Sequence, residues 1–206
     1  IFVSRRRFND ITLYYQKIDK SNLEPLTDWI ELTTIDFISG NWADFHFALS
    51  RHEKKLMVAC RIKLHWTNVQ FNEFYVFGEN MEMVWRRKDS FEFNRQGPRD
   101  NKYIVDEVGN VSVLSVQKRE TLLSILSHIK NSYTIYSYSN NGKDFKEFPV
   151  TYRDQYIRGI KIIGGEQGEL ICAGLYSDLY RPGVRGSFFF KINPASGVIY
   201  DNSFNE

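Results

Sequence analysis

The chain has 206 residues, which is enough for one sizeable hydrophobic core and barely enough for two. Lysine and arginine total 27 against 25 for aspartate and glutamate, so the chain lacks the basic excess that binding to a nucleic-acid backbone normally needs. Hydrophobic residues make up 42% and aromatic residues 16%, a composition that excludes disorder and favours strands. No apolar run is long enough for a membrane-spanning helix. We expect a single domain over residues 1–206, with neither nucleic acid as a partner nor a transmembrane segment.

Aromatic segments of alternating pattern run into polar turns at four places along the chain. The last apolar residues of these segments, in chain order, are Ile18, Phe77, Tyr138 and Ile192. Successive members of this set lie about 55 to 60 residues apart, and a fixed period of this kind is the sequence signature of a repeat architecture. We expect the four residues to occupy equivalent positions in successive repeats.

A second series of segments has the pattern of a strand, a tight turn and another strand. Its three copies span residues 45–64, 101–117 and 156–177, so each repeat holds about four antiparallel strands. The five prolines all lie outside the strand centres, as hydrogen-bonded sheets require. Residues 118–130 break the pattern with apolar residues at helical spacing, which leaves a short helix and a long inter-strand loop both open.

Four-stranded units at this period, without helices between them, are typical of β-propeller blades. The Gly-His and Trp-Asp marks of WD repeats are missing. We predict an all-β fold, an incomplete β-propeller of about three and a half four-stranded antiparallel blades. The approximate blades are residues 1–40, 41–98, 99–152 and 153–206. Because propellers close with four to eight blades, we expect the chain to be a fragment of a larger ring.

Segments near the end of the chain resemble a known group of proteins. Gly168–Ser177 reads GELICAGLYS, and Gly186–Gly197 reads GSFFFKINPASG. These segments resemble a recurring blade of uncharacterised, propeller-like cell-envelope proteins of the Bacteroidetes. Val105–Val113 is similar to the Asp-x-x-Gly-Asn turn of many bacterial six-bladed propellers. The resemblance implies an exported, periplasmic or envelope-associated propeller, and it brings no catalytic residues with it.

Candidate partner-binding residues lie in two predicted loops. His65 and Trp66 connect the second and third strands of one blade, and the corresponding loop of the last blade contains Tyr180, Arg181 and Arg185. Tyrosine, tryptophan and arginine are enriched at the hot spots of protein interfaces. Solvated loops, or packing of the tryptophan against the blade edge, are the alternative for both segments.

Motifs for catalysis and metal binding are missing from the sequence. It has no Gly-x-Ser-x-Gly elbow, and His52-Glu53 is not followed by the second histidine of a zinc-binding helix. The neighbouring carboxylates Asp106 and Glu107 point to opposite faces of a strand and are therefore expected to be turn and surface residues. We predict no catalytic residue, no metal and no cofactor.

The sequence also allows predictions about the burial of two cysteines and the exposure of two basic runs. Cys60 and Cys172 lie in apolar stretches, so we expect buried, unpaired thiols; one disulfide is the alternative in an oxidising compartment. The basic runs Arg5–Arg7 and Arg86–Lys88 are predicted to be solvated strand ends that discourage edge pairing. Contact with anionic lipid or an acidic partner is the alternative for the basic runs.

The function that these features predict is binding without catalysis. We expect a non-catalytic protein-binding propeller of the cell envelope, with a protein partner associated with a membrane. A concrete form is an accessory subunit that docks from the periplasm on an outer-membrane secretion or transport channel. The alternative is a carbohydrate-binding or carbohydrate-active propeller enzyme, in which carboxylates and aromatic residues converge at one mouth of the ring.

Overall fold

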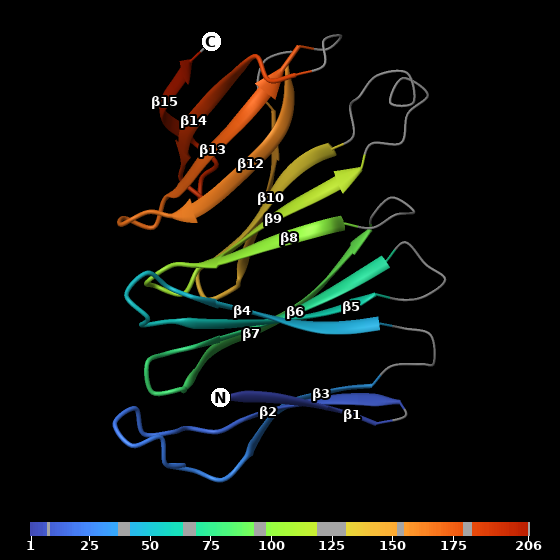
Figure 1. Ribbon diagram of the computed structural model, residues 1–206, viewed down its shortest axis with the longest axis vertical. Coiled ribbons are helices and arrows are strands. Elements are labelled where there is room, and N and C mark those ends of the chain that lie inside the picture. The colour runs from blue at the N-terminus through green and yellow to red at the C-terminus, as the bar shows by residue number, and fades with distance from the viewer. Residues whose placement is uncertain are drawn as a thin grey trace.

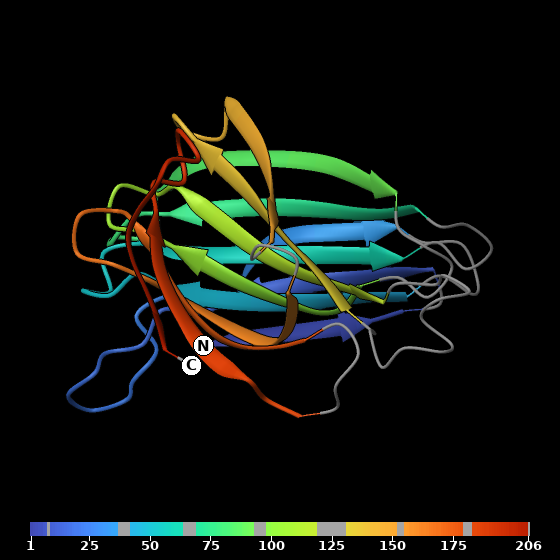
Figure 2. The same cartoon turned by 90° about the horizontal axis from the view of Figure 1, so that it is seen from above.

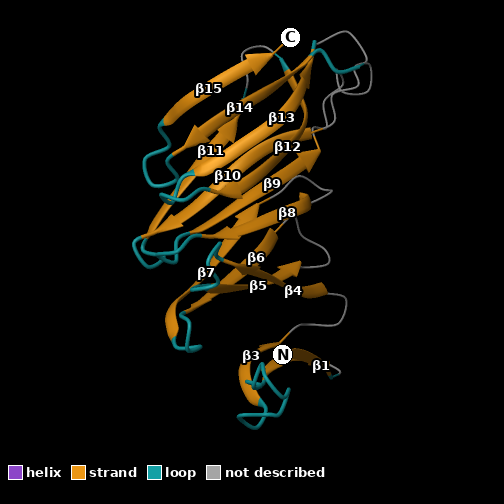
Figure 3. Ribbon diagram, turned by 60° about the vertical axis from the view of Figure 1, so that its left-hand side comes forward, coloured by secondary structure: helices purple, strands orange, loops and turns teal. Residues whose placement is uncertain are grey.

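The structure, a computed structural model, describes residues 1–7, 9–36, 42–63, 69–92, 98–118, 131–151, 155–178 and 183–205. Within these ranges the chain forms strands and their connections only (Figure 3). The strands build four antiparallel sheets that follow one another in chain order like the leaves of a fan (Figure 1). The predicted all-β fold, with the arrangement of an incomplete propeller, is confirmed.

The first sheet has three strands and each of the others has four. The first sheet consists of β1 (Phe2–Arg6), β2 (Asp10–Tyr15) and β3 (Ile30–Asp36). The second consists of β4 (Trp42–Leu49), β5 (Leu56–Lys63), β6 (Val69–Phe77) and β7 (Met83–Glu92). The third consists of β8 (Pro98–Val105), β9 (Val111–Lys118), β10 (Asn131–Ser139) and β11 (Asp144–Val150). The fourth consists of β12 (Tyr156–Gly164), β13 (Leu170–Ser177), β14 (Gly186–Ile192) and β15 (Ile199–Asn205).

Three of the four residues that end the aromatic segments occupy equivalent positions in their sheets. Phe77, Tyr138 and Ile192 lie in the third strand of their sheets, and each pairs with the residue that begins the second strand. Ile18 differs, because it lies beyond the end of β2 and forms an isolated bridge with Pro25. The period read from the sequence therefore locates the third strand in the three four-stranded sheets.

Apolar side chains fill the spaces between successive sheets in three clusters. In β5, Met57 and Ala59 belong to the cluster shared with the third sheet, whereas Val58 and Cys60 belong to the cluster shared with the first. This division follows from the strand period, since successive side chains point to opposite faces. The second and third sheets are therefore covered on both faces.

Both cysteines are free and buried, as predicted. Cys60 lies in β5 of the second sheet and Cys172 in β13 of the fourth, with the third sheet between them in the fan. Burial raises the pKa of both thiols, that of Cys172 to about 12. Each cysteine therefore acts as a small apolar side chain of the core.

In the three four-stranded sheets, the turns between the first and second strands lie on one side of the molecule (Figures 1 and 2). Asp106 and Glu107 belong to one of these turns, as expected. Asp106 Oδ1 accepts a hydrogen bond from the backbone N–H of Asn110 at 2.8 Å. Glu107 reaches the neighbouring turn, where its carboxylate accepts from the backbone N–H of His52 at 2.7 Å and from Ser50 Oγ at 3.0 Å.

The basic run Arg86–Lys88 lies in the middle of β7 and not at a strand end, whereas the exposure of Arg86 and Lys88 on an edge strand agrees with the prediction. Arg86 Nη2 forms an ion pair with Glu73 Oε1 at 2.5 Å, and Arg87 Nη1 donates to the backbone oxygen of Gly142 in the third sheet at 2.6 Å. β7 is an edge strand, so charged residues can continue through it without entering the core. The run Arg5–Arg7 is exposed at the end of β1, as predicted.

Two further expectations concern helices. Residues 119–130, where a short helix or a long loop is predicted, lie outside the described residues. In the part of the chain that the structure describes, no helix has the length and apolar character needed to cross a membrane.

Candidate functional site

The residues predicted to bind a partner lie largely outside the described part of the chain. His65, Trp66, Tyr180 and Arg181 are not described. Arg185 precedes β14, and its Nη1 forms an ion pair with Asp178 Oδ1 at 2.6 Å. Because the other four residues lie outside the described part of the chain, the partner-binding role of all five stays a prediction.

A hollow opens along the first strands of the three four-stranded sheets. β8 lies between β4 and β12 and contacts both of them. The hollow has a volume of about 730 Å³, and we call it the inner hollow. The described residues that line it include His46, Asn101, Lys102, Tyr103, Tyr133 and Gly159. This volume lies within the range of about 300 to 1,000 Å³ that is usual for small-molecule sites.

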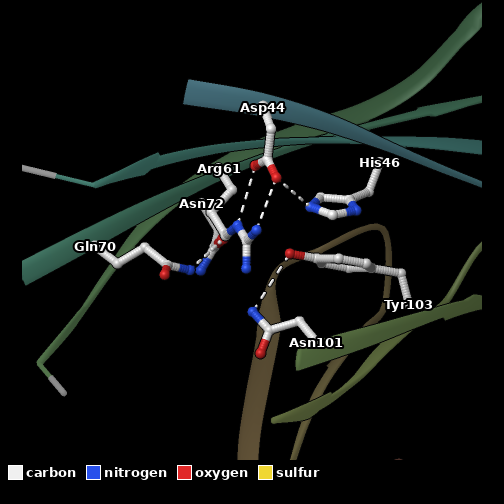
Figure 4. A network of polar contacts seen from close by, with 7 residues as sticks. All are labelled: Asp44, His46, Arg61, Gln70, Asn72, Asn101 and Tyr103. Atoms are coloured by element: carbon white, nitrogen blue, oxygen red, sulfur yellow. Dashed lines mark hydrogen bonds and ion pairs between the residues drawn. The ribbon is translucent and has the colours of Figure 1, made fainter. Parts of the chain in front are cut away.

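A cluster of polar side chains lies beside the inner hollow (Figure 4). Arg61 donates to both carboxylate oxygens of Asp44, with Nε 3.0 Å from Oδ1 and Nη2 2.7 Å from Oδ2. The planar guanidinium group matches the carboxylate in this two-pronged geometry, which makes the pair strong and directional. The Arg61 side chain is only 11% exposed, and its guanidinium carbon lies 4.7 Å from the centre of a Trp42 ring.

His46 links this ion pair to the wall of the hollow. Its Nε2 lies 3.0 Å from Asp44 Oδ2, without the alignment of a hydrogen bond, and its ring centre lies 4.8 Å from that of Tyr103. Burial alone would raise the pKa of Asp44, but the contacts with His46 and Arg61 outweigh it, so the pKa is lowered. Asp44 is therefore ionised at neutral pH and balances the charge of Arg61.

The strand period explains how these residues come together. Asp44 and His46 alternate along β4 and share one face, and Arg61 lies directly opposite Asp44 on β5. On β8, Asn101 Nδ2 donates to the Tyr103 hydroxyl at 3.4 Å, while Asn101 Oδ1 is buried without a partner among the described residues. Sequence reasoning missed this cluster. The available signal was the presence of polar residues at alternate positions of strands that are otherwise apolar.

Lys102 gives the inner hollow a positive charge. It is an exposed residue of β8, and the part of the chain that the structure describes contains no ion-pair partner for it. The described lining residues include neither aspartate nor glutamate. Apolar side chains, Leu114 and Val116 among them, complete the wall. Among the described residues, no group of three histidine, cysteine, aspartate or glutamate side chains is placed to hold a metal ion.

No protein-family model and no curated protein matches the sequence. Solved structures with a similar fold include an ACO/RPE65 chimera, with 11% identity and a TM-score of 0.45 over 94% of this chain and 46% of that chain. They also include cobalt-substituted Synechocystis ACO, with 11% identity and a TM-score of 0.45 over 95% of this chain and 44% of that chain. A variant of Synechocystis apocarotenoid oxygenase has 12% identity and a TM-score of 0.43 over 94% and 46%. The chain thus spans less than half the length of these proteins.

These neighbours correct the predicted function. They are forms of an oxygenase, which is an enzyme, and the prediction of a non-catalytic docking propeller is wrong against this finding. The prediction that the chain is not an enzyme is likewise not confirmed. Identities of 11% to 12% and TM-scores of 0.43 to 0.45 transfer no activity, substrate or residue role to this chain.

Proposed function

We propose that this chain binds a small organic anion in the inner hollow. The observation that carries the proposal is the position of Lys102, a cation without a described ion-pair partner in a hollow whose described lining residues include no acid. The nearby carboxylate of Asp44 is already neutralised by Arg61. A ligand carboxylate beside Lys102 therefore meets a complementary charge.

The other lining groups restrict the shape and polarity of the ligand. Asn101, whose Nδ2 donates to the Tyr103 hydroxyl at 3.4 Å, adds a side-chain amide to the polar part of the wall. Tyr133 contributes a hydroxyl group that donates to the backbone oxygen of Arg158 at 3.3 Å. Leu114 and Val116 make part of the wall apolar. An anion with a partly apolar body fits these surroundings.

The cluster around Asp44 serves this site as a rigid support. Arg61 fixes the carboxylate of Asp44, and Asp44 lies against His46, whose ring packs on Tyr103. On the neighbouring strand β6, where Asn72 pairs with Arg61, Gln70 Nε2 donates to Asn72 Oδ1 at 3.0 Å between two buried side chains (Figure 4). Side chains that are locked in this way hold a binding wall in one geometry, which reduces the entropic cost of binding.

Substitution of Lys102 tests the proposal. Lys102→Met removes the charge and keeps the length of the side chain, so it should weaken binding of hexanoate by about 10- to 100-fold at pH 7, the usual range for a hydrogen bond to a charged group. Isothermal titration calorimetry measures the affinity. The matched control is Lys146→Met, on the exposed edge strand β11, which should bind hexanoate like the unmodified protein.

A neutral ligand of the same length separates charge from apolar contact. Hexanol should bind more weakly than hexanoate and should respond little to Lys102→Met. Equal hexanoate affinity of the Lys102→Met variant and the unmodified protein would contradict the proposal.

A further inference from the structure

We propose that the ligand of the inner hollow is a long-chain, fatty-acid-like carboxylate whose apolar chain crosses β12 into a second hollow on the outer face of the fourth sheet. This inference rests on the proposed function, because the inner hollow supplies the site for the carboxylate. The second hollow supplies the site for the chain, and the two meet at one strand.

The second hollow lies on the face of the fourth sheet that points away from the third. It has a volume of about 620 Å³, and we call it the outer hollow. Its apolar lining includes Ala173, Leu175 and Phe189. Ala173 and Leu175 alternate along β13 with Cys172 and Tyr176, which are buried in the cluster shared with the third sheet. Leu175 is 45% exposed, so apolar surface is available in this hollow.

The two hollows share Gly159 and Ile160 of β12. β12 is an edge strand, and its pairing with β13 is irregular between Ile157 and Gly159. A Cβ atom added at Gly159 would meet nothing within 4 Å, so the space beside this backbone is open. A ligand lying over Gly159 therefore passes from one hollow to the other across a strand edge without a side chain in its path.

Each hollow contains one lysine, but polarity differs between the two hollows in the sense that an amphipathic anion requires. The inner hollow offers Lys102 and polar side chains, whereas the outer hollow offers an apolar floor with Lys161 and Ser187 among its polar residues. The described residues that line the outer hollow again include no acid. An alkyl chain is the occupant that gains from the apolar floor while its carboxylate stays beside Lys102.

The length of the ligand's alkyl chain is the variable that tests this inference. Calorimetric titration with hexanoate, octanoate, decanoate and dodecanoate, each below its micelle concentration, should show affinity that rises by up to about fourfold for each methylene that enters the outer hollow. Gly159→Leu places a side chain in the open space over the strand. It should weaken dodecanoate binding by at least about tenfold, and because Gly159 also lines the inner hollow, a second variant isolates the outer hollow.

A second variant in the outer hollow and a control substitution at another glycine of β12 separate loss of binding from loss of folding. Leu175→Gln changes an exposed side chain of the outer hollow and should also weaken dodecanoate binding while leaving hexanoate binding intact. Gly164→Ala lies in the same strand, where an added Cβ meets only Ile104 at an ordinary 3.4 Å, and it should affect neither ligand. Circular dichroism of each variant verifies the fold.

The outcomes distinguish this inference from the function on which it rests. Hexanoate binding that depends on Lys102, with no gain on lengthening and no effect of Gly159→Leu, would overturn the use of the outer hollow and leave the proposed function standing. Absence of binding for every carboxylate would overturn both. Dodecanoate binding that is weakened in Gly159→Leu and in Leu175→Gln, with hexanoate binding intact in Leu175→Gln, supports the inference.

Discussion

Glu107 shows how one side chain holds two sheets together. It lies in the turn between β8 and β9 and accepts hydrogen bonds from the backbone N–H of His52 and from Ser50 Oγ in the turn between β4 and β5. The hydrogen bond from the backbone of His52, followed by that from Ser50, holds the pKa of Glu107 below its ordinary value of 4.5. An ionised Glu107 therefore stabilises the contact between the second and third sheets.

The pH dependence of stability tests this role of Glu107. Because its pKa is lower in the folded chain than in the unfolded chain, its contribution is complete above about pH 4.5 and is lost as the pH falls through the folded-state pKa. Glu107→Gln should therefore lose less stability than the unmodified protein between pH 6 and pH 3, as measured by urea unfolding. Ser50→Ala removes one donor and should give an intermediate dependence. Identical pH profiles of all three proteins would refute this role.

The sequence predicts only part of the hydrogen bonding at these two turns. Asp106 hydrogen-bonds to amides of its own turn, which its neighbourhood in the sequence predicts. The partners of Glu107 lie in another repeat, and no local pattern indicates them. The same limit applies to the polar cluster, because Asn101 and Tyr103 come from a different sheet than Asp44 and Arg61.

At the scale of elements, β7 fastens the second sheet to the turns of the third. Trp85 Nε1 donates to the backbone oxygen of Gly109 at 2.8 Å, and Arg87 Nη1 donates to that of Gly142 at 2.6 Å. Gly142 has a φ of 74°, and its Cα leaves room only for a hydrogen above the Trp85 ring. The turn between β10 and β11 therefore depends on glycine for its conformation and for close approach.

Substitution of Gly142 tests how closely the turn between β10 and β11 packs on Trp85 of β7. In Gly142→Ala the added Cβ would lie 2.6 Å from Trp85 Cε3 on a backbone that disfavours alanine, so the free energy of unfolding should fall by about 1 to 3 kcal/mol. Urea unfolding followed by tryptophan fluorescence measures it. Gly164→Ala, with an ordinary Cβ contact and no positive φ, should change stability far less. A loss of the same size in both variants would show that the approach of Trp85 is not the cause.

The strands themselves were largely predictable, and the errors share one physical origin. Apolar alternation locates β5, β9 and β13 well, because β5 and β9 are packed on both faces and β13 is packed on the face toward the third sheet. The first strand of the predicted segment 45–64 begins earlier, at Trp42, because the polar Asp44 interrupts the apolar pattern there. Polar residues inside a strand therefore mark both the weak point of the prediction and the position of the candidate site.

At the scale of the whole molecule, the apolar clusters of the described residues join each sheet to its neighbours in the fan (Figure 1). A period read from the sequence predicts such an arrangement, because the three four-stranded sheets use their strands in the same order. The inner hollow was not predictable in this way. Its wall combines residues of β4, β8 and β12, and their meeting depends on how successive sheets pack rather than on any one repeat.

The nearest-neighbour packing predicts a gradient of local stability along the chain. Strands β5 and β9 have a hydrogen-bonded strand on either side and packed sheets on both faces, whereas β1 pairs only with β2 and is largely exposed. Amide hydrogens of β5 and β9 should therefore exchange with solvent at least roughly a hundredfold more slowly than those of β1, as hydrogen–deuterium exchange with mass spectrometry measures.

Strand β13 provides the control for this gradient, because it pairs on both sides but packs against the third sheet on one face only. Its exchange should fall between that of β5 and that of β1. If β13 exchanged as slowly as β5, strand pairing alone would set the protection. If β1 were as protected as β5, the four sheets would open only together, and the free energy of opening would be a property of the whole fan.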